Sequence, residues 1–257
     1  MGVLNVTPDS FSDGGRYLEA GRALERAQAM AGEGAQIIDI GGESTRPGAE
    51  RVPLDEELRR VIQVVRALAR DSELLISVDT SRPEVIAQAV GEGAAIINDV
   101  RALRSAGALE AVARTGAAAC LMHMRGEPPT MQTDIHYSDL LSEVRSMLAA
   151  RLEACLAAGV SSERLCIDPG FGFGKLARHN LELLRQLRQL LSLGRPVLVG
   201  LSRKSMIKEL TGRGKDERLA GSIALATAAV LNGASIVRAH DVAATVDAVR
   251  VAAALRI

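Results

Sequence analysis

The segment GAQII at residues 34–38 decides the fold, because it joins a stretch of helical period (18–31) to a short apolar run that ends at Asp39. The same pattern returns as GAAII at residues 93–97 and as GASIV at residues 233–237. In each copy the glycine suits the residue after a helix, where left-handed backbone is favoured, and a β-rich run follows it. This repeated order predicts parallel strands with helices outside them.

About eight units of this kind fit along the 257 residues. We expect strands at 2–6, 36–40, 74–78, 95–97, 117–122, 164–167, 196–200 and 235–237. We expect helices at 18–31, 54–69, 84–90, 108–114, 138–157, 180–191, 218–231 and 243–255. Eight such units in a chain of this length predict an α/β fold, a (β/α)8 TIM barrel formed by a single domain over residues 1–257. A doubly wound open sheet is the alternative.

Charge and apolar patterning exclude several classes of partner. Lys and Arg number 31, as do Asp and Glu, so no overall field attracts nucleic acid or an anionic membrane. No apolar run approaches the roughly 18 residues of a membrane span, and no basic region with a following apolar stretch opens the chain. The three cysteines lack metal-ligand spacing and are interpreted as small buried apolar residues. We therefore expect a cytoplasmic protein whose partners are small molecules, with no nucleic acid and no membrane.

Polar residues end every expected strand. They are Asn5, Asp39, Asp79, Asn98 with Asp99, His123, Asp168, Ser202 to Lys204, and Arg238 with His240. In a (β/α)8 barrel these residues meet on the face that carries active sites. For Asp99 and His123, capping a helix or bonding a loop is an equal alternative.

Two features of this face indicate ligand binding. The segments 7–16 and 41–52 are long loops rich in Gly, Pro, Ser and Asp, which is typical of lids or binding loops. The clusters SRKS at 202–205 and RAHD at 238–241 follow the last two strands, where this fold commonly binds phosphate. The sequence therefore predicts an anion site beside these strands.

The carboxylates of Asp79 and Asp168, together with Asn98, fall at strand ends with apolar neighbours. A planar heterocycle with two parallel N–H donors would satisfy a carboxylate there. A general acid/base pair, or a buried salt bridge to Arg203 or Arg238, are the alternatives. The glycine-rich run 170–175 is not a nucleotide-binding loop, because Leu176 follows its lysine, and we interpret it as a flexible loop that approaches a ligand closely.

Several motifs resemble the dihydropteroate synthase family. GVLNVTPDSFSDGG at 2–15 and DIGGESTRPG at 39–48 resemble its two signature segments. SVDT at 77–80, IND at 97–99, LMHM at 121–124, DPGFGFGK at 168–175, SRKS at 202–205 and RAHD at 238–241 resemble further motifs in family order. The resemblance spans essentially the whole chain. It implies a transferase of folate biosynthesis and of the sulfonamide-target class, which condenses 6-hydroxymethyl-7,8-dihydropterin pyrophosphate with 4-aminobenzoate to give 7,8-dihydropteroate and pyrophosphate.

The resemblance also implies a role for individual residues. The pterin would be held by Asp79, Asn98, Asp168 and Lys204, with Met122 and Arg238 packed around it. The diphosphate would be held by Thr45, Arg46, Arg238 and His240, and Mg2+ by Asn5. The arylamine would lie near Phe11, Pro47, Phe173 and Lys204, and Ser202 is expected to bind substrate. The catalytic set would be Arg46, Lys204, Arg238 and His240.

Three further expectations accompany this resemblance. A homodimer through the outer helices is implied. The chain starts directly at its first strand, so it is expected to lack the N-terminal segment with which family members cover the barrel bottom. A pterin-dependent methyltransferase and a non-catalytic pterin-binding protein are the alternative functions. The motifs at 45–46 and 238–240 argue against the methyltransferase, because methyl transfer has no diphosphate to hold. The presence of Asn5, Arg46, Lys204 and His240 together argues against the non-catalytic protein.

Overall fold

The computed structural model describes residues 1–6, 16–44, 52–127, 130–133 and 135–256. Its strands are β1 (Gly2–Asn5), β2 (Ile37–Gly41), β3 (Leu75–Asp79), β4 (Ile96–Asp99), β5 (Ala118–Met122), β6 (Leu165–Asp168), β7 (Leu198–Val199) and β8 (Ile236–Val237). Its α-helices are α1 (Arg16–Gly32), α2 (Leu54–Asp71), α3 (Pro83–Gly91), α4 (Ala108–Thr115), α5 (Leu140–Ala157), α6 (Ala177–Arg185), α7 (Ser205–Thr211), α8 (Leu219–Leu231) and α9 (Val242–Leu255). Short 3-10 helices are η2 (Ser162–Arg164), η3 (Leu187–Leu193) and η4 (Lys215–Glu217).

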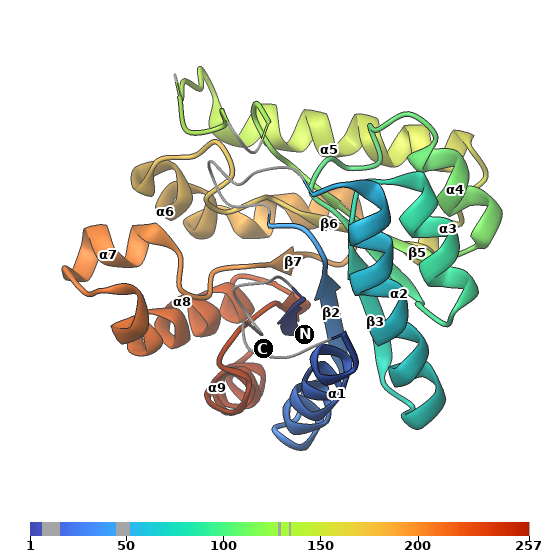
Figure 1. Ribbon diagram of the computed structural model, residues 1–257. Coiled ribbons are helices and arrows are strands. Elements are labelled where there is room, and N and C mark those ends of the chain that lie inside the picture. The colour runs from blue at the N-terminus through green and yellow to red at the C-terminus, as the bar shows by residue number, and fades with distance from the viewer. Residues whose placement is uncertain (7–15, 45–51, 128–129, 134, 257) are drawn as a thin grey trace.

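The strands form a closed ring. β1 to β6 pair in sequence order as a parallel sheet, and β7 pairs with β8. Parallel bridges from Ile167 to Val197 and from Gly2 to Ala239 join the two sheets at both edges. The helices surround this ring, as Figure 1 shows. The fold is the predicted (β/α)8 barrel, and not the doubly wound sheet.

The glycines of the repeated pattern occupy the conformation predicted for them. Gly34, Gly93 and Gly233 have φ values of 99°, 111° and 102°. A Cβ on Gly93 would lie 2.6 Å from the Cβ of Ala69 in α2. Both the backbone and the helix packing therefore require glycine here.

Two helices differ from the expectation. The stretch 180–191 is divided into α6 and η3, and the carbonyl of Leu184 accepts a hydrogen bond from Asn232 Nδ2 (3.1 Å), which competes with continuation of the α-helix. A short helix, α7, precedes the expected helix at 218–231 and begins directly after Lys204. The cluster at 202–205 is typical of a helix start, which α7 confirms, but seven residues are too few to show a helical period.

The interior is aliphatic. Ile38, Ile40, Ile97 and Leu121 are fully buried strand residues, while Phe171 in the β6–α6 loop is among the largest buried side chains. Among the helices that the structure describes, none has the length and apolar character needed to cross a membrane.

Candidate active site

The barrel brings the polar strand ends to the same level. Asn5 lies opposite Gly41, and Gly41 lies opposite Asp79 on its other side. Asp79 lies opposite Asn98 on β4, and farther round the ring Met122 lies opposite Asp168. These registers place side chains that are far apart in the sequence at one end of the barrel, the end that carries the carboxyl ends of the strands.

Asp39 and Arg238 form the centre of the site. Asp39 is fully buried and accepts hydrogen bonds from Ser77 Oγ (2.6 Å), Asn98 Nδ2 (3.1 Å) and Arg238 Nε (2.6 Å). Arg238 also donates to Asp79 Oδ2 at 3.0 Å. Burial by itself lowers the pKa of Arg238, but Asp39 and Asp79 raise it above its ordinary value, so the guanidinium stays charged. The salt-bridge alternative for Asp79 therefore holds with Arg238.

The other alternative partner, Arg203, lies elsewhere. Its guanidinium contacts both oxygens of Asp241 at 3.0 and 2.5 Å. This pair is half-exposed beside α9 and does not contact the carboxylates of the strand ends. Arg203 therefore anchors the chain after β7 to the chain after β8.

Burial shifts the pKa values of two carboxyl groups towards neutrality. Desolvation raises the pKa of Asp79 to about 7, although the charge of Arg238 opposes the shift. Desolvation also raises the pKa of Asp168 to about 6, opposed by a hydrogen bond from Gly170 N (2.7 Å) and by the charge of Lys204. Buried carboxyl groups with such pKa values are typical of functional sites.

Lys204 and Phe173 form a wall beside these strand ends. Lys204 immediately precedes α7, and its Nζ lies 4.4 Å from the centre of the Phe173 ring. Desolvation lowers the pKa of Lys204 to about 8, and the charge of Asp168 opposes that shift. The other face of this wall is apolar, because Phe173 packs against a cluster formed by Val100, Met122, Met124 and Met131. The wall thus combines a cation, an aromatic ring and thioether groups, which suits a flat aromatic ligand.

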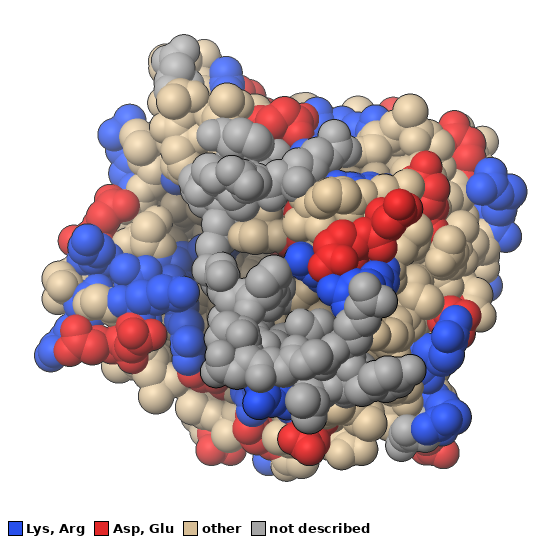
Figure 2. Space-filling view, viewed as in Figure 1, with Lys and Arg blue, Asp and Glu red and all other residues tan. Residues whose placement is uncertain are grey.

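His240 and Ser202 face each other across the ends of β7 and β8. The Ser202 hydroxyl lies 3.0 Å from His240 Nδ1 and accepts from the His240 backbone N at 3.2 Å. Burial lowers the pKa of His240 to about 4, with Arg238 and Arg203 adding to the shift, so the imidazole is neutral. In Figure 2, Lys and Arg side chains gather on the α7 side of this face, which gives that side a positive charge.

Asp99 and His123 have structural partners. The Asp99 carboxylate accepts from the backbone N of Arg101 and of Leu103, both at 2.8 Å, and from the Ser81 hydroxyl. His123 Nδ1 lies 2.9 Å from Lys175 Nζ. Of the two alternatives for these residues, loop bonding is therefore the one observed.

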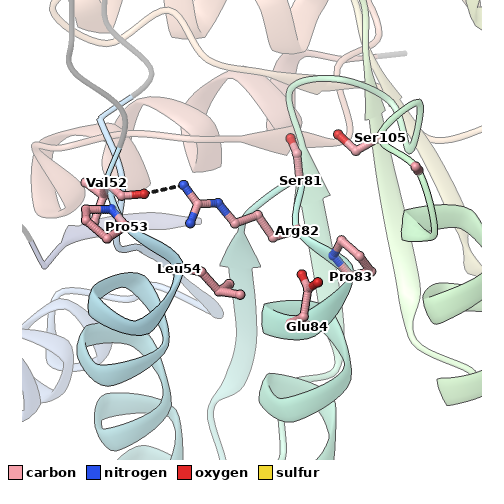
Figure 3. A pocket seen from close by; sticks show the side chains of 9 residues that line it. Val52, Pro53, Leu54, Ser81, Arg82, Pro83, Glu84 and Ser105 are labelled. Carbon is pink, nitrogen blue, oxygen red and sulfur yellow. Dashed lines mark hydrogen bonds between the residues drawn. The ribbon is translucent and has the colours of Figure 1, made fainter.

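A cavity of about 570 Å³ lies at the rim, between the starts of α2 and α3. Arg82 lines it and donates to the carbonyl of Val52, as Figure 3 shows. Its guanidinium also pairs with Glu43 (3.2 Å) and Glu57 (3.0 Å). Arg82 therefore contacts both described ends of the β2–α2 connection. Four candidate site residues, Phe11, Thr45, Arg46 and Pro47, lie outside the described residues.

Comparison with known proteins identifies the family. The sequence model of the pterin-binding enzyme family matches residues 1–240 of this chain. The dihydropteroate synthase of Escherichia coli K12 is 53% identical over 251 residues, which are 98% of this chain and 89% of that protein. The chain belongs to the pterin-binding enzymes, in the dihydropteroate synthase family.

Solved structures agree with this family. The Yersinia pestis dihydropteroate synthase with a sulfonamide drug complex superposes with a TM-score of 0.94 at 49% identity, covering 99% of this chain and 93% of that one. The Xanthomonas albilineans enzyme in complex with 7,8-dihydropteroate gives a TM-score of 0.89 at 48% identity, covering 99% and 92%.

Two residues have partners that the sequence did not predict. Asp39 is among the polar strand ends expected on the active-site face, but the sequence gives no signal that it contacts Arg238. Lys175 is one of only four lysines in the chain, but neither its burial nor its partners could be inferred from that rarity.

Proposed function

We propose that the polar strand ends of this barrel hold the pterin of the substrate and that the wall formed by Lys204 and Phe173 receives 4-aminobenzoate. The activity is that of a dihydropteroate synthase: a dihydropterinylmethyl group passes from its pyrophosphate ester to the arylamine, and pyrophosphate leaves. The observation that carries the residue assignment is the pair of buried carboxyl groups, Asp79 and Asp168, which lie at the same end of the barrel as Asn98 and Lys204.

The pterin would bind through N–H groups donated to these carboxylates. Asp168 Oδ1 already accepts the Gly170 N–H, so its second oxygen is the one available to a ligand. Asn98 Nδ2 is held by Asp39, which leaves its carbonyl oxygen to accept from the ligand. Met122 supplies apolar contact beneath the ring.

The cations would act on the leaving group. Arg238 is permanently charged and is held by Asp39, so its orientation does not depend on ligand. Lys204 adds a second positive charge on the same side, and neutral His240 can donate from its ring to a phosphate oxygen. Groups oriented before the reaction stabilise the charge that develops on departing pyrophosphate without a reorganisation cost. Thr45 and Arg46 are proposed to add to this set from the β2–α2 connection.

We propose that Asn5 helps to hold a magnesium ion. A Cβ on Gly41 would lie 3.7 Å from Asn5 Oδ1, so glycine leaves the space beside this amide oxygen open. The described residues contain no group of three acidic, His or Cys side chains able to hold a metal alone. Asn5 would therefore share the ion with diphosphate oxygens and water, which matches the oxygen coordination that Mg2+ prefers. When bound, the ion would neutralise charge on the diphosphate.

Pyrophosphate release tests this proposal. We expect release to require both substrates and Mg2+ and to yield 7,8-dihydropteroate. Lys204→Ala and Asp168→Ala should abolish turnover while the fold stays cooperative, and Lys208→Ala, an exposed lysine on α7, is the matched control. A folded Asp168→Ala protein with near-normal turnover would overturn the assignment of the pterin edge. Release of methyl groups to a corrinoid acceptor would indicate the methyltransferase instead.

We further propose a cytoplasmic, single-domain enzyme that forms a homodimer through its outer helices. The family membership supports these assignments. Sedimentation analysis would test the oligomer, since a single monomeric species at micromolar concentration would contradict it.

A further inference from the structure

Lys175 is a buried lysine to which the proposed chemistry assigns no role. It ends the glycine-rich run between β6 and α6, and only 3% of its surface is exposed. Its Nζ lies 2.9 Å from Gly170 O, 3.1 Å from Phe173 O and 2.9 Å from His123 Nδ1. The salt bridges of the described chain do not include it. The three N–H groups of the ammonium are therefore used by two loop carbonyls and one imidazole. These three contacts hold the loop in one conformation.

The protonation of the pair agrees with this geometry. Burial and the charge of Lys175 lower the pKa of His123 to about 2, so the ring is neutral and one ring nitrogen can accept. Burial lowers the pKa of Lys175 to about 7, opposed by the charge of Asp168. When Lys175 is protonated it donates to His123, because an ammonium group has no lone pair with which to accept.

In the loop that ends at Lys175, every second residue has a positive φ, a backbone conformation that strongly favours glycine. Gly170, Gly172 and Gly174 have φ values of 69°, 83° and 64°. A Cβ on Gly170 would lie 1.9 Å from the carbonyl oxygen of His123, so the loop lies directly against the chain that follows β5. A loop of this composition has much conformational freedom when its carbonyls are unpaired, and it therefore needs external donors to adopt one shape.

Other donors hold the outer half of the loop. Tyr137 Oη donates to Gly174 O (2.9 Å), and Gln132 Nε2 donates to Gly172 O (2.6 Å). The carbonyls of Gly170 and Phe173 are held by Lys175. Lys175 is thus the donor for the part of the loop that presents the Phe173 ring.

We propose that Lys175 is a positioning residue: it fixes the loop so that Phe173 lies beneath Lys204, and through that ring it sets the binding of 4-aminobenzoate. The Lys204 side chain closes the contact from the other side, because its Cδ would lie 3.3 Å from a Cβ on Gly172. The inference rests on the proposed function, which assigns the arylamine to this wall.

Lys175→Met tests the inference, because methionine keeps much of the apolar stem and removes every donor. We expect the KM for 4-aminobenzoate to rise about tenfold, the factor that one charge-assisted hydrogen bond typically supports. The Kd for 6-hydroxymethylpterin, measured by calorimetry, should stay within about threefold, because the proposed pterin ligands Asp79, Asn98 and Asp168 are strand residues and Lys175 donates to none of them. Amide exchange should accelerate in residues 170–174 and stay unchanged in β6. Lys215→Met removes an exposed lysine and is the matched control.

Each outcome decides the inference. A pterin Kd that rises by the same factor as the arylamine KM would show a general collapse and overturn it, as would an unchanged KM in a folded variant. If Lys175→Met does not fold, Lys175→Gln, which keeps one amide donor group, should show the same split with a smaller rise in KM. If the wild-type protein releases no pyrophosphate, the proposed function fails, whereas the exchange of residues 170–174 still tells whether Lys175 fixes the loop.

Discussion

Replacing Asp39 by Asn removes one negative charge from the middle of the barrel without changing side-chain size. The fully buried carboxylate accepts from Ser77, Asn98 and Arg238 at 2.6, 3.1 and 2.6 Å. An Asn side chain can keep one acceptor oxygen for Asn98 and Arg238, while its amide group faces Ser77, whose hydroxyl can turn to accept. The variant therefore loses the ion pair with Arg238 and keeps the hydrogen bonds.

The loss of folding stability depends on the hydrogen bonds that Arg238 keeps in the variant. Removing one partner of a buried ion pair costs about 3–5 kcal/mol. Arg238 keeps its hydrogen bond to Asp79 at 3.0 Å and is 21% exposed, so we expect the lower end, about 3 kcal/mol. With a urea dependence of about 1–3 kcal/mol per molar, the unfolding midpoint should fall by about 1–3 M.

Urea unfolding followed by circular dichroism measures this loss. Glu92→Gln is the control, because it breaks an equally well-formed pair with Arg66 that lies at the surface, and its midpoint should not change. We also expect the pKa of Asp79 to fall in Asp39→Asn, since the charge of Asp39 contributes to its elevation. Equal midpoints for the two variants would refute the reasoning, because they would show that Asp39 does not hold Arg238 in solution.

Three other perturbations follow from the same contacts. Gly170→Ala sets a Cβ 1.9 Å from a backbone oxygen at a φ of +69°, so thermal unfolding should show a loss of several kcal/mol of stability. Gly159→Ala is the control: its φ is +86° but nothing lies within 4 Å, so it should lose only about 1–2 kcal/mol. Pterin affinity should fall as the pH drops from above 7 to below 6, because the pKa of Asp79 is raised to about 7 and that of Asp168 to about 6, and each protonated carboxyl loses an acceptor. A flat calorimetric profile across this range would contradict the assignment. Asp99→Asn should destabilise the protein by about 2 kcal/mol, because two backbone N–H groups lose a charged acceptor, yet it should leave both KM values unchanged in kinetic assays.

The sequence predicts the barrel because its signals are local. In each unit the glycine, the apolar run and the polar strand end follow one another within a few residues. Because the repeated units predict parallel strands, their polar ends are expected on one face of the barrel. Helix α7 escapes this reasoning, since it is shorter than two full helical periods.

Partners within the site are harder to predict, because they depend on closure of the ring. Asp39 and Arg238 are separated by 199 residues and meet only because β8 lies beside β1. The loop contact of Lys175 depends likewise on β5 lying beside β6. The residue types that carry chemistry are visible in the sequence, whereas the choice between ligand, ion-pair and loop partner requires the register of the strands.

In the buried carboxylates of Asp79 and Asp168, one oxygen already accepts a hydrogen bond from the protein. This limits how a ligand with two N–H donors can bind. Asp79 Oδ2 accepts from Arg238, and Asp168 Oδ1 accepts from Gly170 N. A ligand that forks onto one carboxylate would compete with these bonds, whereas a ligand that bridges both carboxylates would use the remaining oxygens. Bridging predicts that Asp79→Asn and Asp168→Asn each weaken pterin binding, by about tenfold for one charged hydrogen bond, and that the losses multiply in the double variant. If calorimetry finds that one substitution alone removes all the affinity that the double variant loses, the pterin forks onto that single carboxylate, and the other serves only to hold its protein partner.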